Sequence, residues 1–209
     1  MKFTHRTMTA ARKARLSAIS LAVGTLLMAG SLNASAAPFA FDMAVAAAAA
    51  GCVPKAQGHV TIEDAGANQR MQVRVNGLPP HTEFALFVLQ TPTAPFGMSW
   101  YQGDIVTDEN GSGSQQFFGI FSRELFVFAP ATRAAPQTDP GIDAALNPVT
   151  APVHTYHLGL WFSDPADAAN ANCPGNPTPF EGNHRAGIQV LNTGNFGAEA
   201  ADGPLAKFE

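Results

Sequence analysis

The chain has 209 residues, of which 46% are hydrophobic and 13% are charged, and its formal net charge is −4. A net negative charge argues against nucleic acid or anionic lipid as a partner, because both attract basic surfaces. The low charged fraction and the fifteen phenylalanines favour a folded, sheet-rich protein over a disordered one.

Residues 1–36 have the pattern of a secretory signal peptide. A basic region at 2–15 precedes an apolar stretch at 16–29, and Ala34-Ser35-Ala36 supplies the small residues of a cleavage site. The apolar stretch is too short and too interrupted for a membrane span. The sequence therefore predicts a secreted or periplasmic protein without a membrane span. Its mature chain would have 209 − 36 = 173 residues and a formal charge of 7 − 16 = −9.

The two cysteines, Cys52 and Cys173, both lie in the mature part of the chain. In an oxidising compartment they are expected to form one disulfide. The alternative is a lipobox-like site at Ala49-Ala50-Gly51-Cys52, with Cys52 lipidated. That alternative is weaker, because the basic region lies far upstream and Cys173 would lose its partner.

Residues 37–56 are alanine-rich and are expected to form an N-terminal leader, helical or extended, ahead of a folded domain at 57–209. Period-two alternation, as of Met71, Val73 and Val75 with polar neighbours, predicts the strands of that domain. The expected strands are 58–63, 71–76, 84–89, 99–107, 115–121, 124–128, 153–162 and 186–191.

The connections between these strands differ in length and in composition. Asn110-Gly111 is typical of a hairpin turn, and Ser163-Asp164-Pro165 predicts the start of a short helix. Residues 129–152 and the stretch from 174 to 185 are rich in proline and small residues. The loop 129–152 is longer than the connections that compact domains usually contain, which indicates a functional role.

The stretch from Val75 to Phe84 resembles the Gly-Leu-x-Pro-x-Thr-x-Tyr corner of fibronectin type III and other immunoglobulin-like domains. The resemblance implies an all-β fold, here a single immunoglobulin-like β-sandwich with long loops and one short helix. In those families the corner tyrosine bonds nearby backbone through its hydroxyl. Phe84 stands in its place, so that hydrogen bond cannot form.

No nucleophile elbow, phosphate loop, dinucleotide fingerprint or zinc-protease motif occurs in the sequence, so nothing proposes an enzyme. The sequence favours a binding or structural module without a cofactor, whose ligand would be a protein or a carbohydrate. On the strand 153–162, His157 and Trp161 share one face, and the loop 164–184 follows it. These two side chains, with Trp100 and Tyr101 beside another loop, are the predicted ligand contacts. The competing interpretation places both tryptophans in the core.

The opposite face of the same strand carries Leu158, Leu160 and Phe162, which are predicted to be buried. Two further functions stay open. One is a small metal-binding protein that uses some of His154, His157 and His184. The other is a hydrolase with its site on the long loops.

Overall fold

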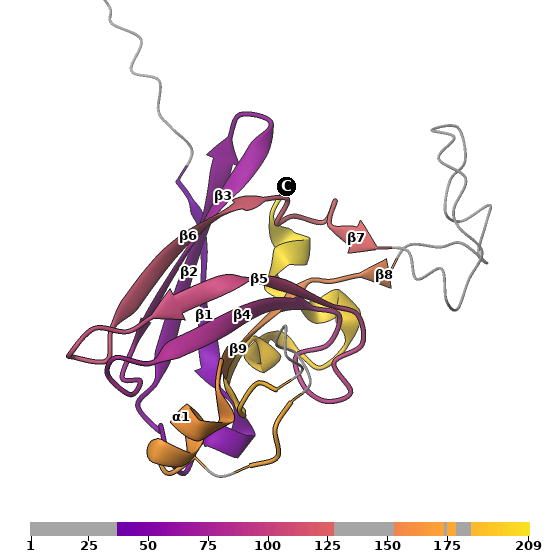
Figure 1. Ribbon diagram of the computed structural model, residues 1–209. Helices are drawn as coiled ribbons and strands as arrows, with labels where there is room; N and C mark the ends of the chain where they lie inside the picture. The colour runs from indigo at the N-terminus through magenta and orange to yellow at the C-terminus, as the bar shows by residue number, and fades with distance from the viewer. Residues whose placement is uncertain (1–36, 128–152, 174, 179–184) are drawn as a thin grey trace, which may run out of the picture. The chain divides into compact units, whose positions relative to one another are not determined.

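Strands dominate the computed structural model of the protein, which describes residues 37–127, 153–173, 175–178 and 185–209 (Figure 1). All of these residues belong to one compact unit. The predicted signal peptide, the loop 129–152 and His184 lie outside the described residues. Within the described part of the chain, the helices are too short or too polar to cross a membrane.

Eight strands form one sheet in the order β5-β4-β9-β10-β1-β2-β3-β6, and every neighbouring pair is antiparallel. A separate pair, β7 and β8, and one α-helix, α1, complete the regular structure, with short 3₁₀ helices η1, η3, η4 and η5. The all-β class with one short α-helix is confirmed. The bounds are β1 Phe39–Val45, η1 Ala47–Ala49, β2 Gln57–Ala65, β3 Asn68–Asn76, β4 Glu83–Leu89, β5 Ser99–Val106, β6 Gly113–Gly119, β7 Phe126–Val127, β8 Val153–His154, β9 His157–Phe162, α1 Pro165–Asn170, β10 Gln189–Asn192, η3 Gly194–Phe196, η4 Ala200–Asp202 and η5 Pro204–Lys207.

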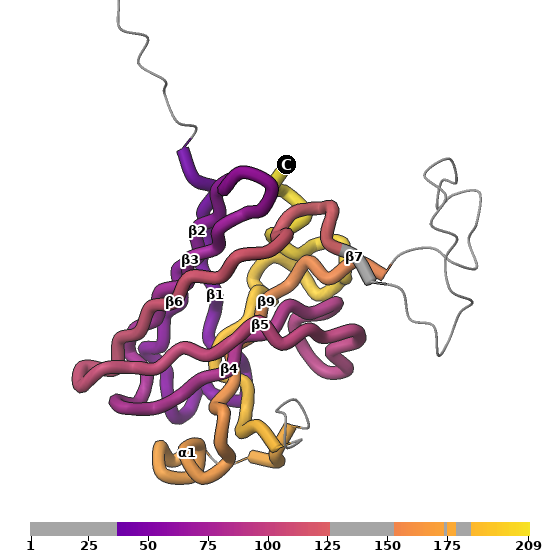
Figure 2. The backbone as a smooth tube through the Cα atoms, turned by 45° about the horizontal axis from the view of Figure 1, so that its top comes forward, coloured from indigo at the N-terminus to yellow at the C-terminus, as the bar shows by residue number. Residues whose placement is uncertain are grey.

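The sheet curls until its two end strands, β5 and β6, lie near each other. Strand β1 makes this possible by changing partner, because residues 39–43 pair with β2 and residues 44–45 pair with β10. In Figure 2, β2, β3 and β6 form one side of the molecule, and β4, β5 and β9 form the other. The result is one continuous sheet close to a barrel, not two clearly separate sheets. The immunoglobulin-like relationship stays a prediction.

The expected boundary between a leader and the domain at residue 57 is wrong. Strand β1 lies inside the sheet between β2 and β10, with Phe41 and Met43 in the core. These side chains alternate with small and polar neighbours, which is a strand pattern. The alanine run at 46–50 obscured it, and residues 47–49 of that run form η1.

Strand β9 is buried on both faces, as its near-continuous apolar sequence requires. Leu158, Leu160 and Phe162 are fully buried in the main core, as predicted. Trp161 points to the other side of the sheet and belongs to a smaller apolar cluster with Phe87. The main core continues with inward-facing side chains of other strands: Val60, Ile62, Met71, Val73, Phe84, Leu86, Val88, Ile105 and Phe117.

The corner between β3 and β4 is held by threonine hydroxyls instead of a tyrosine. Thr107 Oγ1 donates to the carbonyl of Pro79 at 2.6 Å and accepts from the backbone N–H of Thr82 at 3.0 Å. Gly77 has φ +70°, and a Cβ there would lie 2.3 Å from the carbonyl oxygen of Lys55. The loop 107–112 leads from β5 to β6 at the far end of the sheet order. The expected turn is present, because the backbone N–H of Asp108 donates to the carbonyl of Ser112 at 2.7 Å and that of Gly111 to the carbonyl of Asp108 at 3.1 Å. The two strands that it joins are neighbours but do not form a ladder with each other.

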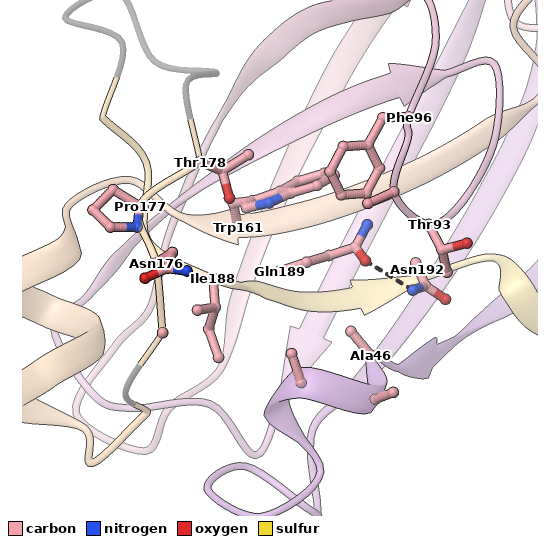
Figure 3. Close-up of a pocket in the computed structure, with 14 residues that line it drawn as sticks. Ala46, Thr93, Phe96, Trp161, Asn176, Pro177, Thr178, Ile188, Gln189 and Asn192 are labelled. Carbon is pink, nitrogen blue, oxygen red and sulfur yellow. Dashed lines mark hydrogen bonds between the residues drawn. The ribbon is translucent and has the colours of Figure 1, made fainter.

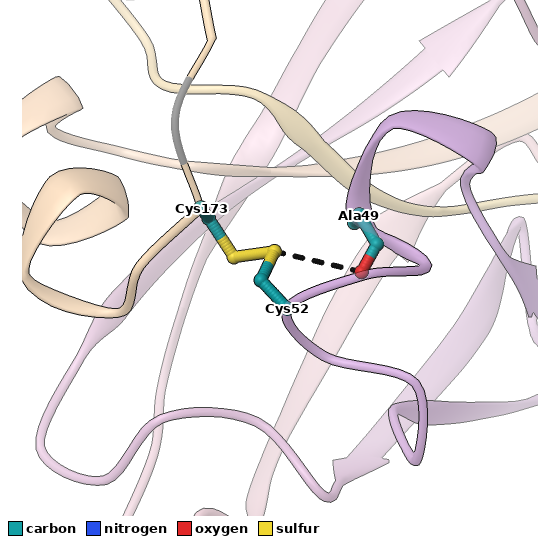
Figure 4. Close-up of a disulfide and its surroundings, with 3 residues drawn as sticks. All are labelled: Ala49, Cys52 and Cys173. Carbon is teal, nitrogen blue, oxygen red and sulfur yellow. Dashed lines mark hydrogen bonds between the residues drawn. A yellow bond between two sulfur atoms is a disulfide. The ribbon is translucent and has the colours of Figure 1, made fainter.

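The predicted disulfide between Cys52 and Cys173 is present, with their Cα atoms 5.3 Å apart (Figure 4). A sulfur in this bond cannot also carry a lipid, so the disulfide argues against the lipobox alternative. The bond joins the turn that follows η1 to the end of the α1 segment. It therefore connects two surface segments that lie 121 residues apart in the sequence.

Candidate functional site

A cavity of about 500 Å³ lies on the outer side of β9 and β10 (Figure 3). Three segments from distant parts of the sequence surround it. They are the turn at 46–48, the loop at 93–96 and the stretch at 175–178, and the two strands contribute its floor. The lining residues are Ala46, Ala47, Ala48, Thr93, Ala94, Phe96, Trp161, Gly175, Asn176, Pro177, Thr178, Ile188, Gln189 and Asn192.

Trp161 forms the aromatic part of the floor, and its side chain is fully buried. Its ring meets Phe96 edge-on at 5.1 Å and Phe87 edge-on at 5.5 Å between ring centroids. Gly159 leaves the space that this ring occupies, because a Cβ there would lie 2.4 Å from the indole. Trp161 is therefore held in one position, with Phe96 of the loop packed against it.

Two carboxamides on β10 supply the polar part of the floor. Gln189 Nε2 donates to the carbonyl of Pro92 at 3.0 Å, and Asn192 Nδ2 donates to Gln189 Oε1 at 2.9 Å. Asn192 Oδ1 in turn accepts from the backbone N–H of Gly194 at 2.9 Å. These bonds orient both amides. Among the described residues each NH₂ group makes one hydrogen bond, which leaves its second hydrogen for a ligand.

Among the described residues that line the cavity, none is acidic, basic or a histidine. This lining offers no general acid or base and no countercharge for an ion. It suits an uncharged ligand, with Thr93 and Asn176 exposed at the rim. The hydrolase alternative also involves the loop 129–152, outside the described residues, and stays a prediction.

Both members of the predicted pair on β9 are fully buried, as the core interpretation expected for Trp161, and of the two only Trp161 borders the cavity. The His157 side chain is fully buried, with Nδ1 2.9 Å from Thr193 Oγ1 and Nε2 2.9 Å from the carbonyl oxygen of Glu199. The C-terminal segment covers this end of the strand. The prediction that His157 contacts a ligand is therefore wrong.

Trp100 and Tyr101 lie on the edge strand β5, away from the cavity, and are 59% and 48% exposed. As neighbours in a strand they point to opposite sides of the sheet. Tyr101 donates its hydroxyl hydrogen to Asp104 Oδ2 at 2.7 Å. The structure therefore does not bring the predicted contacts together into one site, and a role for these two stays a prediction.

At least one of the three histidines proposed for a metal site is not available as a ligand. His157 donates from Nε2 to a carbonyl, and its Nδ1 faces a hydroxyl, so neither nitrogen is available to a metal. His154 lies on β8 with Nδ1 2.7 Å from the Tyr156 hydroxyl. Within the described ranges, no three His, Cys, Asp or Glu residues are grouped to hold a metal. His184 is outside those ranges.

The buried His157 should make stability depend on pH. Loss of hydration lowers the pKa of its imidazole below the ordinary 6.5, against opposing hydrogen bonds and the Asp202 carboxylate. The unfolded chain then binds the proton more readily than the folded protein does. We expect the free energy of unfolding to fall as the pH drops below 6.5, by up to about 1.4 kcal/mol per pH unit from this group.

Urea unfolding at a series of pH values measures this slope. His157→Gln removes the titrating group and should give a flatter dependence between about pH 5 and 7. The other titratable groups are common to both proteins, so their contributions cancel in the comparison. Parallel pH profiles of the two proteins would contradict the assignment.

Neither protein-family models nor curated protein sequences match this chain. The site therefore rests on its own geometry. Sequence reasoning pointed to the loop before Trp100 and to the loop 164–184, which contains 175–178, but it missed the turn at 46–48 and the amides of β10. Gln189 was the available signal, because it is a polar residue inside an otherwise apolar strand, Ile188 to Leu191.

Proposed function

We propose that this protein is an exported binding module that takes an uncharged, mainly apolar ligand with a hydrogen-bond acceptor into the cavity on β9 and β10. The observation that carries the proposal is the cavity itself, about 500 Å³, with Phe96 in its wall and the buried ring of Trp161 under its floor. Its volume is in the range of small-molecule sites. The oriented amides of Gln189 and Asn192 supply donors for a carbonyl or ether oxygen of the ligand.

Export is supported by two independent features. Residues 1–36 have the signal-peptide pattern, and disulfides such as Cys52–Cys173 form in oxidising compartments. Binding is favoured over catalysis, because the described lining has no titratable side chain that could transfer a proton.

The uncharged dye Nile red, which has a carbonyl acceptor, is a suitable probe. We expect it to bind the purified protein saturably at one site with a rise in its fluorescence. Ala48→Phe places a ring in the cavity from an exposed position of η1. This variant should weaken binding by about tenfold or more, equivalent to about 1.4 kcal/mol.

Ala50→Phe is the matched control, because Ala50 is exposed on the same turn and does not line the cavity. It should bind the dye as the wild type does. The proposal fails if the wild type shows no saturable binding, or if the two variants bind equally well.

A further inference from the structure

A second surface lies on the outer side of β1, β2, β3 and β6, which are consecutive in the sheet, whereas the floor of the cavity belongs to β9 and β10. Strand alternation sends the apolar side chains of these strands into the core and the others outward. We call these outward side chains the amide face. Its members are Ala40, Asp42, Gln57, His59, Thr61, Glu63, Arg70, Gln72, Arg74, Asn76, Ser114, Gln116 and Phe118.

Neighbouring strands hold several of these side chains in place. Gln116 Nε2 donates to Gln72 Oε1 at 3.2 Å, and Gln72 Nε2 donates to Ser114 Oγ at 2.7 Å. Across β1 and β2, His59 Nδ1 donates to Asp42 Oδ1 at 2.7 Å. Side chains restrained in this way lose less conformational entropy when they bind a ligand.

The amide face has a hollow at one end and an exposed aromatic ring at the other. A hollow of about 310 Å³ lies where β1 leaves β2 for β10, and its lining includes Asp42, His59, Gln57 and Asn76. Phe118 lies in the row farthest from this hollow, opposite Arg70, and is 61% exposed.

The charges of the amide face cancel, which distinguishes it from the rest of an acidic protein. Asp42 and Glu63 are balanced by Arg70 and Arg74, and the face has no lysine. A nucleic acid would require an excess of basic residues. A protein interface would require an apolar centre, and this face has one exposed aromatic ring at its margin.

We propose that the amide face binds a neutral polysaccharide. Sugar hydroxyls both donate and accept hydrogen bonds, and this face offers amides that do both and carboxylates that accept. The apolar C–H face of a sugar ring can pack on Phe118. A chain that lies across the strands would contact the ring, the Gln72–Gln116 row and the hollow in succession.

Native electrophoresis through gels that contain mixed-linkage β-glucan, galactomannan or dextran tests this inference. We expect at least one of these polysaccharides to retard the wild-type protein. Gln116→Ala and Phe118→Ala should each weaken the interaction by roughly five- to tenfold. Both side chains are exposed, so the fold should tolerate their removal.

Two matched controls come from the same sheet. Gln115→Ala removes the same side chain one residue earlier, on the opposite side of β6, and Trp100→Ala removes an exposed ring on β5. Both should migrate as the wild type does. The inference is overturned if none of the three gels retards the wild type, or if Trp100→Ala abolishes a retardation that Gln116→Ala and Phe118→Ala leave intact. Ala48→Phe should retain this interaction, which separates it from the function of the cavity.

Discussion

Replacing both Cys52 and Cys173 with serine is expected to lower the free energy of unfolding by about 5 kcal/mol. The disulfide closes a loop of 173 − 52 + 1 = 122 residues. The bond lowers the conformational entropy of the unfolded chain, so less entropy is lost on folding than without it. Urea denaturation monitored by circular dichroism measures the difference. A loss below about 1 kcal/mol would show that the unfolded chain is already constrained without the bond.

The same disulfide should also strengthen ligand binding, because it holds segments next to the cavity in position. It connects Cys52, four residues after the cavity wall at 46–48, with Cys173, two residues before the cavity wall at 175–178. Wild-type protein reduced with dithiothreitol, at a urea concentration where it stays folded, provides the comparison without any substitution. Nile red should bind the reduced protein more weakly than the oxidised one. Equal binding would mean that the cavity walls hold their positions without the bond.

Leu160→Ala is expected to lower the free energy of unfolding by about 2–5 kcal/mol, through lost apolar burial and the cavity left behind. Leu160 is fully buried in the middle of β9, between Leu158 and Phe162. Both neighbouring strands, β4 and β10, pair with β9 at this position, so the backbone has little freedom to move in and fill the space.

Val106→Ala is the control for this substitution, because Val106 is also an aliphatic strand residue but is 59% exposed. Its effect should stay within about 0.5 kcal/mol. Equal losses in the two variants would contradict the assignment of β9 to the centre of the core.

The sequence alone was sufficient where a structural rule acts over a few residues. The alternation of Met71, Val73 and Val75 predicted an inward and an outward face, and both are present in β3. The same rule separated Leu158, Leu160 and Phe162 from Trp161. Two cysteines behind a signal-peptide pattern were enough to predict the disulfide, because only one pairing is possible within the chain.

Only the tertiary structure decided what lies over each outward-facing side chain. His157 and Trp161 occupy equivalent positions in the strand pattern and are both fully buried, but the C-terminal segment encloses His157 whereas Trp161 lies under the floor of a cavity. The same holds for β1, whose place between β2 and β10 depends on partners distant in the sequence. Periodicity reports which side of a strand a residue faces, but the covering segments arrive through long loops whose paths local sequence does not determine.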